Sequence, residues 1–108
     1  MTQPGDYQFD SVLATDEVVH AEAEARDAKL LVTDRRVVVA EEGRTALALP
    51  IEELRRIQFD VERTRPATLV IVPEAAGHEP QVLAIPHGQI RAVTEALALI
   101  GERLSERD

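Results

Sequence analysis

The sequence contains no cysteine and no tryptophan, and only 3% of its residues are aromatic. Without cysteine there can be no disulfide, no thiolate nucleophile and no cysteine-based zinc site. The aromatic residues Tyr7, Phe9 and Phe59 are too few to form a platform on which nucleic-acid bases could stack. No hydrophobic run approaches the about 20 residues of a membrane-spanning helix, and the acidic start lacks the apolar segment of a secretory signal. We therefore expect a cytoplasmic protein.

Basic residues are in the minority. Among 108 residues, 12 Lys and Arg face 20 Asp and Glu, which gives a formal net charge of −8. Such a chain repels phosphate-rich partners, so we expect no binding to nucleic acid and little attraction to anionic membranes. The length and the 44% hydrophobic content suit one domain with one core. We assign residues 1–15 to an N-terminal tail with a short helical turn and residues 16–108 to the domain.

Short hydrophobic runs alternate with polar turns through most of the chain. β-branched and aliphatic residues at 30–32 and 37–40 flank the turn sequence TDRR, in which we expect the Asp34 side chain to close the turn. The next turn contains Gly43, which can adopt a positive φ. These patterns predict strands at residues 30–32, 37–40, 45–49, 57–62, 68–72 and 81–85.

The segment at residues 19–25 has two interpretations. Its apolar and polar residues alternate strictly, as they do in a half-buried strand. Its alanines and glutamates, however, are strong helix formers. The strands that follow it favour the interpretation as a strand.

The hydrophobic period changes in the last segment. Apolar residues there recur every three or four positions, which is typical of an amphipathic helix: Ile90, Val93, Leu97, Ile100 and Leu104. Such a helix must pack on an apolar surface, and seven strands are too many for one flat sheet. We therefore predict a mainly β fold, a seven-stranded antiparallel, partly open barrel or sandwich capped by one C-terminal α-helix.

Two stretches of the sequence resemble bacterial pleckstrin-homology (PH)-like domains. DEVVHAEAEARDAKLLVTDRRVVVA is similar to the opening of these domains, in which an acidic residue and a strand precede a hydrophobic run, a Thr-Asp/Asn-x-Arg turn and another strand. LALPIEELRRIQFD resembles their next element, a strand that ends near proline, a hydrophobic-acidic turn and a further strand. The resemblance covers residues 16–104 and implies that residues 19–25 form a strand.

The resemblance implies a binding role. PH-like folds are similar in shape, but some members bind phosphoinositide headgroups, some bind peptides along a strand edge, and some bacterial members assemble into rings or act as scaffolds. Our first hypothesis is a non-enzymatic module for protein–protein interaction or self-assembly into an oligomer. Its partner would add to the edge of the strand at 57–62, beside Gln58, Asp60 and Glu62.

The alternative hypothesis is a lipid-headgroup or small-anion site built from a rim of arginines, Arg35, Arg36, Arg55 and Arg56. Lipid-binding members of the superfold carry alternating basic residues across the first two strands. The corresponding stretch here, EAEARDAKLLVTDRR, surrounds its basic residues with acids. Membrane-lipid binding is therefore the less favoured of the two hypotheses.

No catalytic pattern is present in the sequence. His20, His78 and His87 are scattered and lack the spacing of a metal site. The two serines, Ser11 and Ser105, lie near the termini and outside any nucleophile motif. We therefore predict no catalytic residue, no cofactor and no metal.

Overall fold

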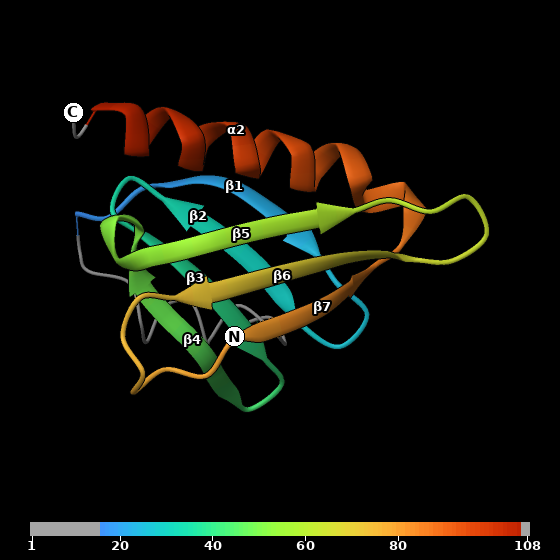
Figure 1. Cartoon of the computed structure of the whole chain (residues 1–108), viewed down its shortest axis with the longest axis horizontal. Coiled ribbons are helices and arrows are strands. Elements are labelled where there is room, and N and C mark those ends of the chain that lie inside the picture. Colours follow the sequence, from blue (N-terminus) through green and yellow to red (C-terminus); the bar gives the residue numbers. More distant parts are fainter. Residues whose placement is uncertain (1–15, 107–108) are drawn as a thin grey trace, which may run out of the picture.

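A computed structural model of the protein describes residues 16–106 (Figure 1). The predicted tail with its helical turn, residues 1–15, lies outside the described residues. The strands are β1 (Val19–Glu24), β2 (Lys29–Thr33), β3 (Arg36–Glu41), β4 (Arg44–Pro50), β5 (Leu54–Asp60), β6 (Ala67–Pro73) and β7 (Gln81–Ile85). The helices are the short 3₁₀ turns η1 (Ile51–Glu53) and η2 (His87–Gln89) and the α-helix α2 (Ile90–Glu106).

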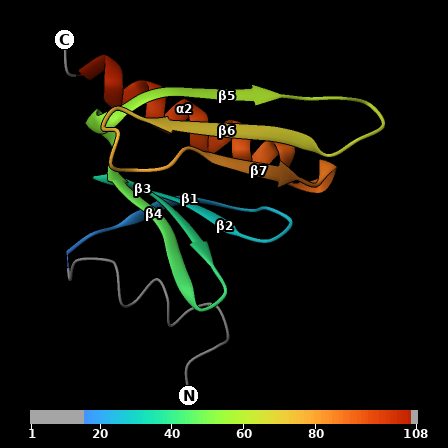
Figure 2. The same ribbon diagram turned by 60° about the horizontal axis from the view of Figure 1, so that its bottom comes forward.

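The strands form two antiparallel sheets. Sheet A has the order β1-β2-β3-β4 and sheet B the order β5-β6-β7, so every strand pairs with its neighbour in the sequence. The two sheets face each other, and α2 lies along one side, next to β1 and β5 (Figures 1 and 2). The predicted mainly β architecture with seven strands and a C-terminal helix is confirmed.

The ambiguous first segment is a strand. β1 pairs antiparallel with β2, and Ala23 is buried in the core with 1% of its surface exposed. The register shifts between Val19 and Ala21, which indicates a β-bulge there. Because a bulge interrupts the alternation of faces, Val19 is 38% exposed although the pattern placed it with the inward alanines.

The turn between β3 and β4 depends on a glycine. Gly43 has a φ of 79°, the only positive φ among residues 16–106, and this confirms the prediction made for it. A residue with a Cβ atom is strained in this conformation, whereas glycine is not. Gly43 therefore allows the tight connection that brings β4 back along β3.

The core lies between the sheets and is closed by α2. Val93, Ala96 and Ile100 are at most 1% exposed and pack with the inward side chains of both sheets. Leu97, Leu104 and Ile90 are only partly buried, so the centre of the helical stripe passes through Ala96, which the predicted stripe omitted. Small side chains at the centre let a helix approach a sheet closely, with larger ones filling the flanks.

The strand predicted at residues 57–62 is displaced in the structure. β5 begins at Leu54, directly after η1, and ends at Asp60. Asp60 pairs with Thr68 near the start of β6, so the residues after Asp60 have no partner strand. Val61 is consequently 56% exposed, and Glu62 lies in the loop instead of the strand.

Candidate functional site

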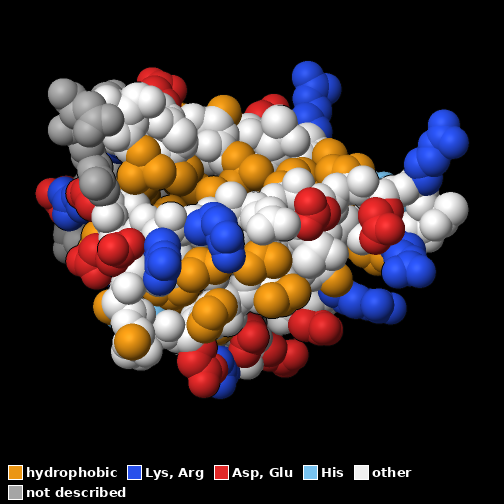
Figure 3. All heavy atoms as spheres, viewed as in Figure 1, with side chains coloured by type: hydrophobic (Ala, Val, Ile, Leu, Met, Phe, Trp, Pro, Cys, Tyr) orange, Lys and Arg blue, Asp and Glu red, His pale blue; other side chains and the backbone are white. Residues whose placement is uncertain are grey.

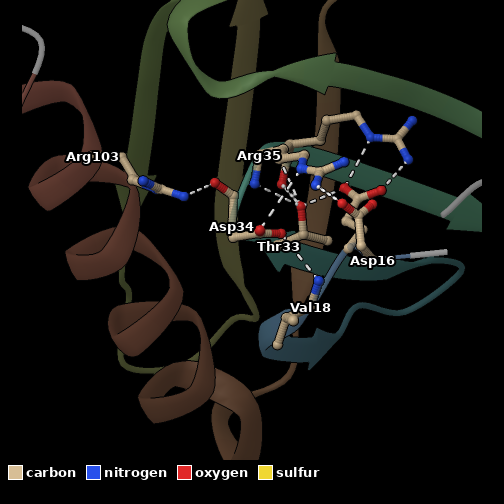
Figure 4. Close-up of polar contacts among 8 residues, drawn as sticks. Asp16, Val18, Thr33, Asp34, Arg35 and Arg103 are labelled. Atoms are coloured by element: carbon tan, nitrogen blue, oxygen red, sulfur yellow. Dashed lines mark hydrogen bonds and ion pairs between the residues drawn. The ribbon is translucent and has the colours of Figure 1, made fainter. Parts of the chain in front are cut away.

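The turn between β2 and β3 is the most densely bonded polar region of residues 16–106 (Figure 4). The Thr33 hydroxyl accepts hydrogen bonds from the backbone N–H groups of Arg35 at 3.0 Å and Arg36 at 2.8 Å. Thr33 therefore closes the turn, a role that the sequence analysis gave to Asp34. The Asp34 carboxylate instead accepts the backbone N–H of Val18 at 3.1 Å, and the Asp34 N–H donates to the Val18 carbonyl at 3.0 Å.

A buried ion pair lies against this turn. The guanidinium of Arg36 donates to both carboxylate oxygens of Glu17, at 2.5 Å and 3.0 Å. The Thr33 hydroxyl donates to Glu17 at 2.6 Å, so the carboxylate has three donors. The Glu17 side chain has no solvent exposure. This hydrogen bonding raises the pKa of Arg36, and two parallel bonds fix the pair in one geometry.

The neighbouring arginine forms an exposed ion pair. Arg35 donates to the carboxylate of Asp16 at 2.7 Å, and their side chains are 46% and 76% exposed. The hydrogen bond from Arg35 lowers the pKa of Asp16 below its ordinary value and raises that of Arg35. Asp34 lies 3.8 Å from the same guanidinium. Both arginines of the turn therefore have their charge balanced by acids from the segment that leads into β1.

Two further elements bond to the backbone of this turn. Arg103, from α2, donates to the Asp34 carbonyl (Figure 4). The Ile51 N–H, in η1, donates to the Arg35 carbonyl at 3.0 Å. The turn thus joins the segment before β1, the connection between the two sheets and the C-terminal helix. Its chemistry is that of a structural junction.

The four arginines proposed as an anion site lie at one end of the barrel. Arg55 and Arg56 are exposed at the start of β5, which lies at the same end as the β2–β3 turn (Figure 1). No described residue forms an ion pair with either of them, whereas Arg35 and Arg36 are paired with acids. The structure therefore leaves two of the four charges available for an anion.

The residues proposed as a partner-binding edge separate into two groups. Gln58 and Asp60 are exposed on β5 and are hydrogen-bonded to each other at 3.1 Å. Glu62 lies beyond the strand, and its carbonyl is 2.9 Å from the Nε2 atom of His87. The same nitrogen is 2.6 Å from the Arg65 carbonyl, so His87 ties the β5–β6 loop to the start of η2.

β5 is an edge strand. It pairs with β6 on one side, and within residues 16–106 no other segment hydrogen-bonds to its backbone. Ile57 and Phe59 are partly buried against the core. A band of hydrophobic side chains runs between α2 and β5, and another group lies over β6 and β7 (Figure 3). Val82 of β7, which is 68% exposed, belongs to the outer face of sheet B.

Sequence reasoning did not identify Glu17, Arg103 or Val82. An ion pair of Glu17 could have been predicted, because two acids directly precede the first strand and two arginines occupy the β2–β3 turn. The sequence offered no comparable reason to single out Arg103 and Val82, because their roles depend on how α2 and sheet B are placed.

Within residues 16–106, no group of three or more His, Asp or Glu side chains is arranged to hold a metal ion. None of the helices in this range has the length and hydrophobicity needed to cross a bilayer.

Two antiparallel sheets of four and three strands, closed by one C-terminal helix, define the pleckstrin-homology fold. A solved structure supports this assignment: the chain is similar to a crystal structure of a pleckstrin homology domain from Shewanella amazonensis SB2B. The TM-score is 0.63 and the sequence identity 14%, over 93% of this chain and 96% of that one. No protein-family model matches the sequence, and no curated protein matches it either. The likeness establishes the PH-like fold.

Proposed function

We propose that the chain is a non-enzymatic binding module that takes up an extended strand, from a protein partner or from a second copy of itself, along the free edge of β5. The observation that carries the proposal is that this strand has hydrogen-bonding groups on one side with no partner among residues 16–106. Backbone N–H and C=O groups at a sheet edge form a template for another strand.

The surroundings of β5 favour this edge. The edge strand β1 of sheet A is packed by α2. β7, the other edge of sheet B, accepts the Arg26 N–H at the Ala84 carbonyl, 2.8 Å away. β5 instead lies beside a hydrophobic band that continues onto α2 (Figure 3). A strand added there would form main-chain hydrogen bonds and cover alternate apolar side chains, which together give affinity and specificity.

The experiment combines light scattering with selection of peptides from a displayed random library. For self-assembly, we expect the mass in solution to rise above 11.9 kDa as the concentration increases. For a foreign partner, we expect selected peptides to slow amide hydrogen exchange in residues 54–60. A strictly monomeric protein that selects no peptide acting on β5 would overturn the proposal.

A matched pair of variants locates the site. Gln58→Lys combined with Asp60→Lys places two lysines on the edge, which natural proteins use to block strand addition, so association should weaken about tenfold or more. Glu42→Lys combined with Glu79→Gln changes the net charge by the same amount at exposed positions away from β5. Equal losses in both variants would mean that overall charge, and not the β5 edge, governs association.

A second candidate function is binding of a lipid headgroup or small anion. It is favoured by Arg55 and Arg56, which are adjacent, exposed and without an ion-pair partner among residues 16–106. The test is sedimentation with anionic liposomes and with neutral ones. Arg55→Gln with Arg56→Gln should abolish salt-sensitive binding, while Arg35→Gln, which removes a charge already paired with Asp16, should preserve it. Binding that ignores both salt and these substitutions would contradict an arginine site.

A further inference from the structure

The edge strand β5 (Figure 1) carries opposite charges at equal distances from its centre. Arg56 lies two residues before Gln58 and Asp60 two residues after it, so all three side chains share one face of the strand, and all three are exposed. Ile57 and Phe59, on either side of Gln58, are partly buried against the core. Reversing the direction of the strand therefore exchanges the basic and acidic positions and leaves the apolar positions in place.

These two charges have no charged partner within the sheet. In the pairing with β6, Arg56 lies opposite Val72 and Asp60 lies opposite Thr68. Gln58 donates a hydrogen bond to Asp60 at 3.1 Å, and Arg56 forms no ion pair with any residue in the range 16–106. Both charges are therefore available to groups on a strand added at the open edge.

We propose that the edge of β5 pairs antiparallel with β5 of a second copy of the chain, in a register centred on Gln58. The inference rests on the proposed function, because it needs the open β5 edge, and it specifies the partner and the register. In this register Arg56 of each copy lies opposite Asp60 of the other, and Ile57 lies opposite Phe59. Ion pairs and aliphatic–aromatic pairs directly across two strands both stabilise antiparallel sheets.

Symmetry leaves few other registers. Two identical antiparallel strands are related by a two-fold axis, which here passes between one residue and its own copy. An axis at Arg56 or Asp60 would place like charges directly opposite each other, which is unfavourable. An axis at Ile57 or Phe59 would place Gln58 opposite Arg56 or Asp60 and would form no ion pair within β5. Of these registers, only the one centred on Gln58 pairs both charges.

The residues that flank β5 continue the same order of charge. Two exposed glutamates precede the strand and two exposed arginines follow it: Glu52, Glu53, Arg63 and Arg65. In the register centred on Gln58, Glu53 of one copy lies at the level of Arg63 of the other. The acidic approach to β5 therefore lies beside the arginines of the second copy, so electrostatic complementarity extends beyond the paired strands.

Pairing of this kind closes after two copies, because the same surface is used on both sides of the axis. We therefore expect a species of twice 11.9 kDa in sedimentation velocity. The interface of one strand pair is small, so this dimer should dissociate on dilution. A continuing series of larger assemblies would contradict the two-fold arrangement.

Charge reversal tests the register in the full chain. Arg56→Asp and Asp60→Arg each place two pairs of like charges opposite each other, so each variant should dimerise at least about tenfold more weakly than the natural sequence. The variant that combines both substitutions restores the two ion pairs and should dimerise as the natural sequence does. An equimolar mixture of the two single variants should form a heterodimer, because each opposed pair then joins an acid and a base.

The single variants also separate strand pairing from the effect of net charge. The natural chain has a net charge of −8, and Asp60→Arg makes the charge less negative. If the net charge governed association, Asp60→Arg would strengthen it, whereas the register predicts that it weakens. Glu79→Arg is the matched control, because it changes the charge equally at an exposed position outside β5, and it should not weaken the dimer.

Two results would overturn the inference: a natural chain that stays monomeric at high concentration, and single variants that dimerise as tightly as the natural chain. Amide hydrogen exchange distinguishes this failure from that of the proposed function. If the chain stays monomeric but a selected peptide slows exchange in residues 54–60, the edge of β5 binds a foreign strand and only the self-pairing is wrong. If dimers form without slowed exchange in residues 54–60, both proposals are wrong.

Discussion

The carboxylate of Glu17 lies 2.5 Å from the guanidinium of Arg36, at a position where the glutamate side chain has no solvent exposure. The two residues are separated by 19 positions in the sequence, so their pairing fixes the entry into β1 against the start of β3. Removing a charge from water is costly, and a buried pair persists only when its hydrogen bonds are satisfied. Here the second hydrogen bond from Arg36 and the hydrogen bond from the Thr33 hydroxyl complete the bonding of the Glu17 carboxylate.

Loss of Arg36 should therefore destabilise the protein strongly. Arg36→Ala leaves the Glu17 charge buried without its main partner, and we expect a loss of about 3–5 kcal/mol in the free energy of unfolding. Urea denaturation followed by circular dichroism measures it. Arg35→Ala is the matched control, because it removes the adjacent arginine from an exposed pair, and its effect should lie within the error of the measurement. Similar losses in both variants would contradict the distinction between the two pairs.

Acidic pH should weaken the Asp16–Arg35 contact. Because Arg35 lowers the pKa of Asp16 in the folded state, the contact stabilises the protein above the unfolded-state pKa, about 3.9. That contribution is lost as the pH falls through the folded-state pKa. Carboxyl NMR titration should find the pKa of Asp16 below its ordinary value in the native chain and higher in Arg35→Gln, because the hydrogen bond from Arg35 is the largest cause of the lowering. An unchanged pKa in the variant would exclude Arg35 as the cause.

Two glycine substitutions should have opposite effects. Gly43→Ala places a Cβ atom at a φ of 79°, which should cost about 1–2 kcal/mol. Gly101→Ala lies in α2, where nothing is within 4 Å of the added methyl group, and should stabilise the helix by about 0.5–1 kcal/mol. Thermal unfolding of the two variants checks both signs. An unchanged unfolding temperature in Gly43→Ala would mean that the β3–β4 turn can change its conformation.

The contact between α2 and the core should be essential. Ile100 is 1% exposed, so Ile100→Ala creates a cavity and should cost about 2–5 kcal/mol. Val82→Ala also shortens an aliphatic side chain, but at a position with 68% exposure, and should cost less than about 0.5 kcal/mol. Chemical denaturation of both proteins measures the difference. A small loss for Ile100→Ala would indicate that the barrel is stable without a tightly packed helix.

Most of the architecture could be predicted from local patterns. The strand at residues 81–85 has the predicted bounds, and the amphipathic stripe identified α2. The boundaries of β5 could not be read in this way, because Leu54 joins the sheet through its pairing with Pro73. The candidate sites were less accessible to prediction. Arg35, Arg36, Arg55 and Arg56 look alike in the sequence, and only the position of Glu17 and Asp16 distinguishes the paired arginines from the exposed ones.

By itself the sequence determined most of the elements, because the periods of strands and helices are properties of neighbouring residues. Those periods and the helix propensities left residues 19–25 open between strand and helix. Tertiary structure alone decided which charges are paired and which apolar faces are covered. Glu17 forms an ion pair with Arg36, and Leu31 is buried away from the core, because folding brings together groups that lie far apart along the chain. Ion pairing and burial depend on the distances between groups in the folded chain, and a local sequence pattern carries no information on these distances.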